Sequence, residues 1–251
     1  MKTSLRTAGK IFLFILLISC SKKNKESGGN NEPEKGYASG KITHADGSPM
    51  PGVTVIVDNT MFYNTYVAAV SNERGIYKVK LPSAGTYHAT ADIKKTYNGK
   101  EYTLRLHPDN DNVFSVDGAV RNFTYKLTGA YPDGLGYYGG TIIVDKDVMS
   151  EIYDTENVEL TLTPVGKLID GSQGQTLKLR PGQPRTDNYG KLVDVPIGRY
   201  NISAVHVSGS ARKPLKLQNR VTNGPFESTL QIDFEPSIIW GNNIAALGYK
   251  E

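Results

Sequence analysis

The sequence predicts an all-β protein built as two tandem antiparallel β-sandwich domains. Short segments alternate apolar and polar side chains, among them TVIVDN, IYKVKL, TYHATA, EYTLRL, VELTLT, QTLKLR and YNISAVHV. Gly, Pro, Asn and Asp separate these segments at short intervals, and no long stretch has the 3.6-residue period of an amphipathic helix. The length of 251 residues fits two small domains better than one.

Residues 1–19 have the features of an export signal. Three basic residues precede an unbroken apolar run, Ile11 to Ile18. A helix that spans a bilayer needs roughly 20 apolar residues, so this run is too short to be one. A basic segment followed by a short apolar core is typical of a secretory signal peptide.

The run ends in Leu17-Ile18-Ser19-Cys20, which resembles a lipobox, with Leu three positions before the only cysteine of the chain. The resemblance implies that Cys20 becomes the mature N-terminus and carries a diacylglycerol and usually a third acyl chain such as palmitate. Two or more chains anchor a protein stably to a membrane. The sole thiol is then consumed and cannot form a disulfide or serve as a nucleophile. The alternative is an ordinary signal peptide with an incidental thiol.

Residues 20–35 are expected to form a flexible tether. The sequence after Cys20, SKKNKESGGNNEPEKG, has no apolar side chain worth burying, so it cannot offset the entropy lost on ordering. Its length gives an end-to-end distance of roughly 20 Å, enough to hold a domain clear of lipid headgroups. Ser21 is not the aspartate linked to inner-membrane retention in enteric bacteria. We therefore expect an outer-membrane location, with the leaflet left open.

The charge balance argues against a nucleic-acid partner. The whole chain has a net charge of +4, but removal of Lys2, Arg6 and Lys10 with the signal leaves 26 basic and 25 acidic residues. Nucleic-acid binding requires a clustered basic face. The basic pI of the whole chain owes much to the discarded signal.

Residues 36–128 are expected to form the first sandwich. In GIYKVKLPSAGTYHATA, Gly75 to Ala91, apolar residues alternate with lysines, which predicts a strand with one buried and one solvated face. Pro82 ends this strand because it cannot donate to the ladder. Tyr87 follows Gly85 after a tight turn and resembles a tyrosine corner, in which the phenol bonds to loop backbone. We interpret this tyrosine as structural.

Residues 140–251 are expected to form the second sandwich, because the phrase recurs as GKLVDVPIGRYNISA, Gly190 to Ala204. Here Pro196, Gly198 and Tyr200 take the corresponding roles. The stretch from Gly to Pro is one residue shorter in this copy, and a slip of one residue reverses the faces of a strand. The two entering strands therefore cannot superpose residue for residue.

The first unit carries Gly40-Lys-Ile-Thr-His-Ala-Asp-Gly47-Ser-Pro49-Met-Pro51-Gly52, then Gly75-Ile-Tyr77, then Pro82-Ser-Ala-Gly85-Thr-Tyr87. This spacing resembles the carboxypeptidase regulatory-like family, which implies a transthyretin-like sandwich without the peptidase domain. The chain departs from the family in carrying Ser71-Asn72-Glu73-Arg74 where Thr-Asp is usual. The second unit keeps only part of the pattern, so its family is left open. The layout also resembles small lipoproteins found beside outer-membrane glycan-uptake systems.

A hinge is expected at residues 129–139, because TGAYPDGLGYYGG contains five glycines and one proline and cannot form a sandwich core. Aromatic rings in loops can stack on sugars, and a cleft between domains is a common ligand site. The candidate ligand-binding residues are Tyr131, Tyr137 and Tyr138 at the hinge and Trp240 near the C-terminus, with Phe62, Tyr63 and Tyr66 in the first unit. The alternative is that the hinge aromatics simply pack the two domains together.

No catalytic centre, metal site or cofactor is expected. The histidines, His44, His88, His107 and His206, form neither H-E-x-x-H nor a close pair, and no G-x-S-x-G occurs. The run from Asp109 to Asn112 lacks the glycine and the later glutamate of a calcium loop. The chain ends Gly-Tyr-Lys-Glu, without the Tyr-Arg-Gly-Ser tail of transthyretin-like hydrolases.

The sequence thus favours a non-catalytic outer-membrane lipoprotein that acts as a structural or protein-interaction module in a surface glycan-uptake or adhesion assembly. Its partners would be the membrane, through the lipid on Cys20, and an outer-membrane transporter or a surface glycan-binding protein. The alternative is a carbohydrate-binding protein that stacks polysaccharide on the hinge and loop aromatics.

Overall fold

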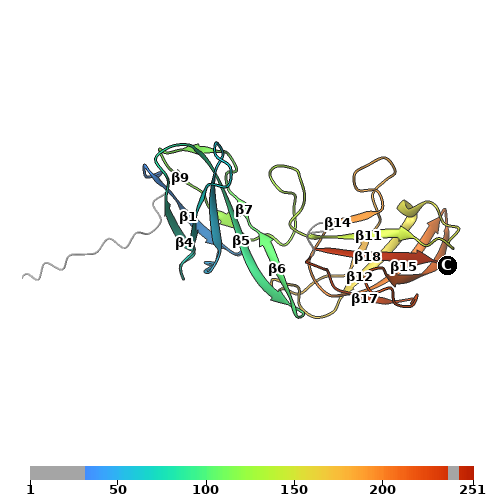
Figure 1. Cartoon of the computed structure of the whole chain (residues 1–251). Coiled ribbons are helices and arrows are strands. Elements are labelled where there is room, and N and C mark those ends of the chain that lie inside the picture. Colours follow the sequence, from blue (N-terminus) through green and yellow to red (C-terminus); the bar gives the residue numbers. More distant parts are fainter. Residues whose placement is uncertain (1–31, 237–242) are drawn as a thin grey trace, which may run out of the picture.

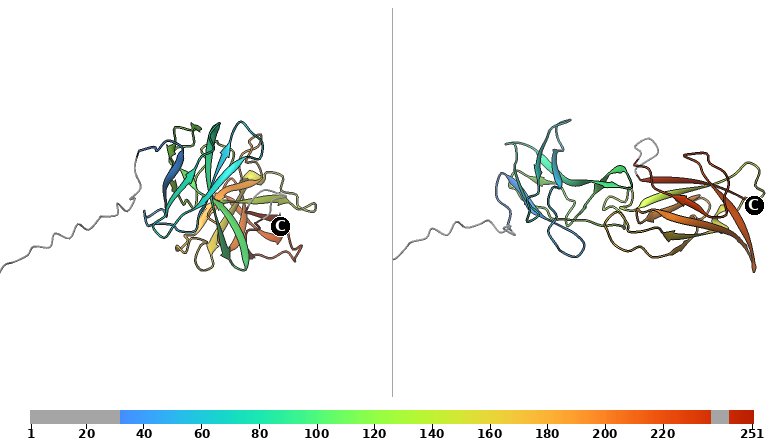
Figure 2. Two further views of the ribbon diagram at one scale, coloured as in Figure 1. Left: turned by 60° about the vertical axis from the view of Figure 1, so that its left-hand side comes forward. Right: turned by 90° about the horizontal axis from the view of Figure 1, so that it is seen from below.

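The computed structural model describes residues 32–236 and 243–251, which form eighteen strands and one short 3-10 helix, η1 (Thr155–Asn157). The all-β fold class predicted from the sequence is confirmed. The strands gather into two bodies that lie end to end, with the C-terminus at the far end of the second body (Figure 1, Figure 2). Among these described residues, no helix has the length and hydropathy that crossing a bilayer requires.

The first body is a sandwich of two sheets. Its strands are β1 (Tyr37–Thr43), β2 (Thr54–Asn59), β3 (Tyr66–Val70), β4 (Ile76–Lys80), β5 (Thr86–Tyr97), β6 (Lys100–Arg105), β7 (His107–Pro108), β8 (Phe114–Ser115), β9 (Ala119–Val120) and β10 (Phe123–Thr124). One sheet has the order β4-β1-β10-β7, with β9 also paired to β1. The other has the order β3-β2-β5-β6, with β8 paired to β5.

The second body is one continuous sheet folded on itself. Its strands are β11 (Gly140–Lys146), β12 (Val158–Pro164), β13 (Leu177–Leu179), β14 (Lys191–Val195), β15 (Tyr200–Ser208), β16 (Ala211–Asn219), β17 (Leu230–Ile232) and β18 (Ile244–Lys250). The order is β13-β12-β15-β16-β18-β11-β14, with β17 also paired to β15. The first half of β16 pairs with β15 and the second half with β18, so this strand joins the two layers.

Period-two alternation places the core as the sequence predicts. In β4, Tyr77 and Val79 are buried and Lys78 and Lys80 are exposed. Tyr200 and every second residue after it in β15 are likewise buried as far as Ala204. The buried apolar side chains of both bodies belong to one cluster. Removal of this surface from water is the main driving force for folding.

Three strand pairs are parallel in a fold that is otherwise antiparallel. In the first body, β1 pairs in parallel with β9 and with β10. In the second body the first strand, β11, pairs in parallel with the last, β18, over six residues. These pairs bring the start and the end of each body side by side, which the alternation pattern alone did not indicate.

Both tyrosine corners predicted from the repeated phrase are confirmed. The Tyr87 hydroxyl donates to the backbone carbonyls of Pro82 and Ala84, at 3.0 and 2.8 Å. The Tyr200 hydroxyl donates to the carbonyl of Pro196 at 2.7 Å. Burial raises the pKa of both phenols, so each remains a donor that locks the preceding turn.

The one-residue difference between the two copies of the phrase is absorbed by a β-bulge in β14. Gly140 of β11 lies opposite Val195 and Ile142 lies opposite Leu192, so β14 holds one extra residue over this interval. The bulge contains Asp194, whose φ of +59° is in the left-handed region. Because of the bulge, Leu192 and Val195 both face the core, and the predicted failure of the two strands to superpose is confirmed.

Candidate functional site at the junction of the two bodies

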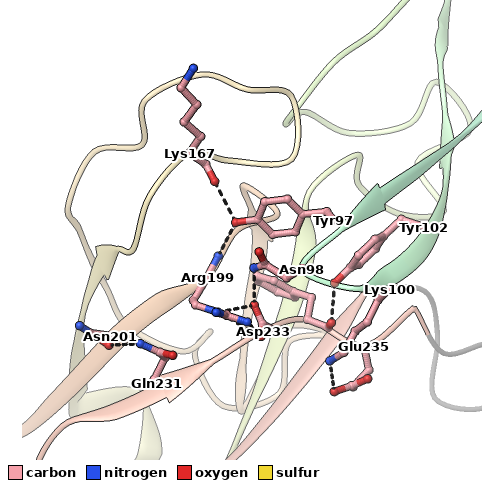
Figure 3. Close-up of polar contacts among 11 residues, drawn as sticks. Tyr97, Asn98, Lys100, Tyr102, Lys167, Arg199, Asn201, Gln231, Asp233 and Glu235 are labelled. Carbon is pink, nitrogen blue, oxygen red and sulfur yellow. Dashed lines mark hydrogen bonds and ion pairs between the residues drawn. The ribbon is translucent and has the colours of Figure 1, made fainter.

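The β5–β6 hairpin reaches from the first body onto the second. The two strands pair from Asp92↔Arg105 to Tyr97↔Lys100 and are joined by a two-residue turn. Asn98 and Gly99 in that turn both have positive φ, +48° and +79°, as a type I′ turn requires. The tip of the hairpin lies among residues of the second body (Figure 3).

Two tyrosines of this hairpin bond to backbone of the second body. The Tyr97 hydroxyl donates to the Lys167 carbonyl at 2.8 Å and accepts from the Arg199 backbone N–H at 3.0 Å. The Tyr102 hydroxyl donates to the carbonyl of Phe234 at 2.7 Å. Tyr102 is fully buried, and burial raises the pKa of its phenol. Each hydroxyl thus satisfies backbone groups that would be costly to leave unpaired.

Charged and amide groups complete the contact (Figure 3). Arg199 Nη2 lies 2.7 Å from Asp233 Oδ2, and Arg199 Nε also donates to this carboxylate. Asn98 Nδ2 donates to Asp233 Oδ1 at 2.8 Å, and Lys100 Nζ lies 2.6 Å from Glu235 Oε1. Burial alone would raise the pKa of Asp233, but the hydrogen bonds from Arg199 and Asn98 outweigh it and the pKa is lowered. The hairpin tip therefore bonds to the ionised carboxylate of Asp233.

Asp194 holds the connector between the two bodies from the other side. Its carboxylate accepts from the Gly129 N–H at 2.9 and 2.8 Å and from the Gly139 N–H at 3.1 Å. A Cβ at Gly139 would lie 2.7 Å from the Asp194 carbonyl carbon, so glycine permits this close approach. The bulge in β14 thus aims one carboxylate at both ends of the connector.

The connector between those glycines is itself a hairpin. Ala130 and Tyr137 form an antiparallel bridge, and the Tyr131 N–H donates to the Gly136 carbonyl at 2.9 Å. The Gly134 N–H closes the tip on the Tyr131 carbonyl at 3.0 Å. Leu135 at the tip is exposed. Residues 129–139 therefore have internal hydrogen bonds that oppose free bending.

Tyr131 and Tyr138 contact each other at the junction. Their rings meet edge to face with centroids 4.7 Å apart, and the Arg105 guanidinium lies 5.6 Å from the Tyr131 centroid. Tyr138 is buried, and its hydroxyl lies 2.9 Å from His107 Nδ1. Burial lowers the pKa of His107 and raises that of Tyr138, so both groups are favoured in their neutral forms. Both tyrosines pack the junction, as the alternative interpretation of the hinge aromatics proposed.

Two of the hinge tyrosines, Tyr131 and Tyr137, line a groove of about 380 Å³. The groove runs between the connector and the outer face of β11 and β14, and Tyr137, Leu135, Asn188 and Lys191 contribute to its walls. A second, smaller pocket of about 240 Å³ lies between the β5–β6 strands and Tyr131, with Asp92, Thr103 and Arg105 in its polar lining.

The other candidate residues lie elsewhere. Trp240 and Cys20 fall outside the described residues, so the structure does not place them. Phe62, Tyr63 and Tyr66 are exposed on the loop and strand that follow β2, whose last residue pairs with Tyr87 at the end of β5 opposite the hairpin tip. The junction therefore brings together the three hinge tyrosines and leaves the first-unit aromatics apart from them.

The histidines and the acidic run take part in local structural contacts. His88 Nε2 lies 3.0 Å from Asp111 Oδ1, and His206 Nε2 lies 2.9 Å from both oxygens of Asp154. The Asp109 carboxylate accepts from the backbone and side chain of Asn122. In the part of the chain that the structure describes, no cluster of three or more His, Cys, Asp or Glu could hold a metal ion.

Three solved structures have some likeness to this chain. The Bacillus anthracis TIE protein has a TM-score of 0.31 and 15% identity over 87% of this chain, which spans 35% of that protein. GBS52, the minor pilin of Streptococcus agalactiae, has a TM-score of 0.25 and 13% identity over 85% of this chain and 96% of its own. The B1 repeat of the Staphylococcus aureus collagen-binding protein has a TM-score of 0.25 and 14% identity over 86% of this chain and 98% of its own. No family model and no curated protein matches the chain.

All three TM-scores lie below 0.5, so the fold class rests on the chain's own strands. The residues that build the junction were missed by sequence reasoning. The Asn98-Gly99 pair is a signal for a two-residue hairpin and could have located the β5–β6 turn. Nothing in the sequence indicates that this turn contacts Asp233, 135 positions later.

Proposed function

We propose that this protein is a non-catalytic, lipid-anchored spacer and interaction module of the bacterial outer membrane, in an adhesion or glycan-uptake assembly. The observation that carries the proposal is the junction. Tyr97, Tyr102 and Asn98 tie the first body to the second, while Asp194 ties down the connector. A linkage of this kind holds the second body at a fixed distance from the first.

The far end of the second body supports a role in recognition. Strand β11 runs from the junction to Lys146, and the loop after it exposes Val148, Met149 and Tyr153, with exposed fractions of 87, 78 and 74%. Apolar and aromatic side chains gathered at one exposed place are typical of protein-binding surfaces. We call this set the distal loop and propose that it contacts a protein partner of the surface assembly.

The anchor is tested in cells that produce the full chain and are fed an alkyne analogue of palmitate. We expect the analogue to label the protein that has Cys20 and to be absent from the Cys20→Ala variant. Equal labelling of both proteins would exclude lipidation at this residue.

The interaction is tested by crosslinking in the same cells, followed by isolation of the protein from the outer membrane. Val148→Ser/Met149→Ser/Tyr153→Ser should lose the crosslinked partner. The control, Val113→Ser, alters an exposed apolar side chain of the first body outside the distal loop and should keep it. A partner retained by the distal-loop variant would contradict the proposed surface.

Carbohydrate binding is the second candidate function, and the groove at the connector favours it. The groove combines the Tyr137 ring with the amide of Asn188 and the amine of Lys191, a mixture of apolar and polar groups that suits a sugar. Affinity electrophoresis against a set of polysaccharides tests this. Retardation that disappears in Tyr137→Ala but persists in Tyr153→Ala would support binding in the groove, and no retardation by any polysaccharide would exclude it.

A further inference from the structure

The loop between β2 and β3 presents apolar side chains to solvent. Met61 and Phe62 are 66 and 55% exposed, and Tyr63 is fully exposed. The segment from Asn59 to Val70 contains no charged residue. We call Met61, Phe62 and Tyr63 the proximal loop. Such a cluster is unusual on a surface that faces only water.

The base of the proximal loop is held firmly. Asn59 is buried, its Oδ1 accepts from the Met61 N–H at 2.9 Å, and its Nδ2 donates to the Ala84 carbonyl at 3.1 Å. The Thr60 N–H donates to the Thr86 carbonyl at 2.8 Å. Backbone groups at the base of the loop are therefore paired within the protein, which lowers the cost of moving the loop out of water.

Strand pairing places the proximal loop at the end of the first body where the N-terminal segment enters. Thr86, next to the loop, also pairs with Ser115 of β8. The Gly36 N–H donates to the Val116 carbonyl, and the Gly36 carbonyl accepts from the Leu81 N–H, both at 2.8 Å. The junction lies at the opposite end of β5, a strand of twelve residues that is roughly 40 Å long.

The chain between Cys20 and residue 32 is short compared with that distance. As the tether expected from the sequence, these twelve residues would have an end-to-end distance of roughly 17–21 Å. If Cys20 carries lipid, as the proposed function holds, the end of the molecule with the proximal loop stays beside the bilayer. The effective concentration of the loop at the lipid surface is then on the order of millimolar, so a weak affinity suffices.

We propose that the proximal loop docks into the interfacial region of the bilayer that holds the Cys20 acyl chains. Tyrosine rings favour the headgroup level, because one end of the side chain is apolar and the other is wet. Methionine and phenylalanine add apolar area that the bilayer removes from water. With the lipid as one contact and the loop as a second, the first body has a defined orientation on the membrane. In this orientation the distal loop points away from the membrane.

The test uses a chain that begins at Ser21 and carries a hexahistidine tag in place of Cys20. The tag binds the protein to vesicles of phosphatidylethanolamine and phosphatidylglycerol that contain a nickel-chelating lipid. The tag reproduces the tether without lipidation. A single cysteine, introduced as Tyr63→Cys or as Tyr153→Cys, carries an environment-sensitive fluorophore. The vesicles also contain a lipid with a nitroxide in its acyl chain, which quenches fluorophores that enter the bilayer.

We expect quenching at position 63 and none at position 153. Adding Met61→Ser and Phe62→Ser to Tyr63→Cys should remove the quenching, while adding Val148→Ser and Met149→Ser should not. No quenching at position 63, or equal quenching at both positions, overturns the proposal. Because the tag replaces the lipid, these results do not depend on Cys20, whose acylation the labelling in cells tests separately.

Discussion

At the residue scale, tyrosine hydroxyls serve as structural donors throughout the molecule. Tyr87 and Tyr200 lock turns, Tyr97 and Tyr102 cross the junction, and Tyr249 lies 2.8 Å from the Thr155 hydroxyl in the core of the second body. In each case the ring adds buried apolar area while the hydroxyl satisfies a polar group in its neighbourhood. The repeated Gly-x-Tyr phrase indicated only the first two of these.

Removal of a corner hydroxyl should lower stability without changing the fold. Tyr200→Phe leaves the Pro196 carbonyl without its donor, and we expect a loss of about 1–2 kcal/mol in the free energy of unfolding. Chemical denaturation of the mature chain measures this. Tyr63→Phe, at a fully exposed position, is the matched control and should have no effect. Equal stability of Tyr200→Phe and the unmodified protein would contradict the role of the corner.

Asp194 should protect two particular backbone amides. In Asp194→Ala the N–H groups of Gly129 and Gly139 lose their acceptor, so their hydrogen exchange should accelerate. The Tyr138 N–H, which donates to the Gly129 carbonyl at 2.9 Å, should follow them as the connector loosens. Unchanged exchange at all three amides would show that the carboxylate does not hold the connector.

Asp233 makes the stability of the junction depend on pH in the acidic range. Its pKa lies below the ordinary value of 3.8, so its contribution to stability is complete above that value and is lost as the pH falls through the lowered pKa. Asp233→Asn should be less stable than the unmodified protein near neutral pH, and the difference should shrink below about pH 4. Denaturation as a function of pH measures this difference in stability. A difference that persists in acid would contradict the ion pair with Arg199.

At the scale of the elements, the strands were predictable because alternation, turn residues and strand-ending prolines act locally. Two features were not. The bulge in β14 could be anticipated as a mismatch in length, but the use of Asp194 as an acceptor depends on a connector more than fifty positions earlier. The contact of the β5–β6 tip with Arg199, just before β15, and with the segment after β17 is also non-local, and local patterns carry no information about it.

The edge strand β3 differs from the other strands that end the sheet orders. Of these, β4, β6, β13 and β14 carry charged residues and β7 carries Pro108, which discourages pairing with another chain. β3 reads YVAAV, with Tyr66 and Val70 exposed. We expect the mature chain to self-associate at high concentration, and Ala68→Lys to reduce this in sedimentation experiments. Thr103→Lys, on the already charged β6 edge, is the control. Self-association unaffected by Ala68→Lys would exclude the β3 edge as its cause.

At the scale of the whole molecule, two sandwiches are joined into an elongated unit with different surfaces at its ends (Figure 1). The proximal loop lies at the end where the N-terminal segment enters, and the distal loop lies at the end of β11 remote from the junction. The predicted hinge was the natural place for bending. Its internal hydrogen bonds and the hairpin from β5 and β6 instead favour one fixed arrangement of the two bodies.

The distance between the two bodies tests this account most directly. Nitroxide labels at Lys41→Cys in β1 and Lys178→Cys in β13, both exposed positions, can be attached to the mature chain without Cys20 and measured by pulsed electron spin resonance. We predict a single narrow distance distribution, which broadens when Tyr97→Ala, Asn98→Ala and Lys100→Ala remove the hairpin contacts. A distribution that is already broad in the protein with its hairpin intact would contradict a fixed junction, and with it the proposed role as a spacer.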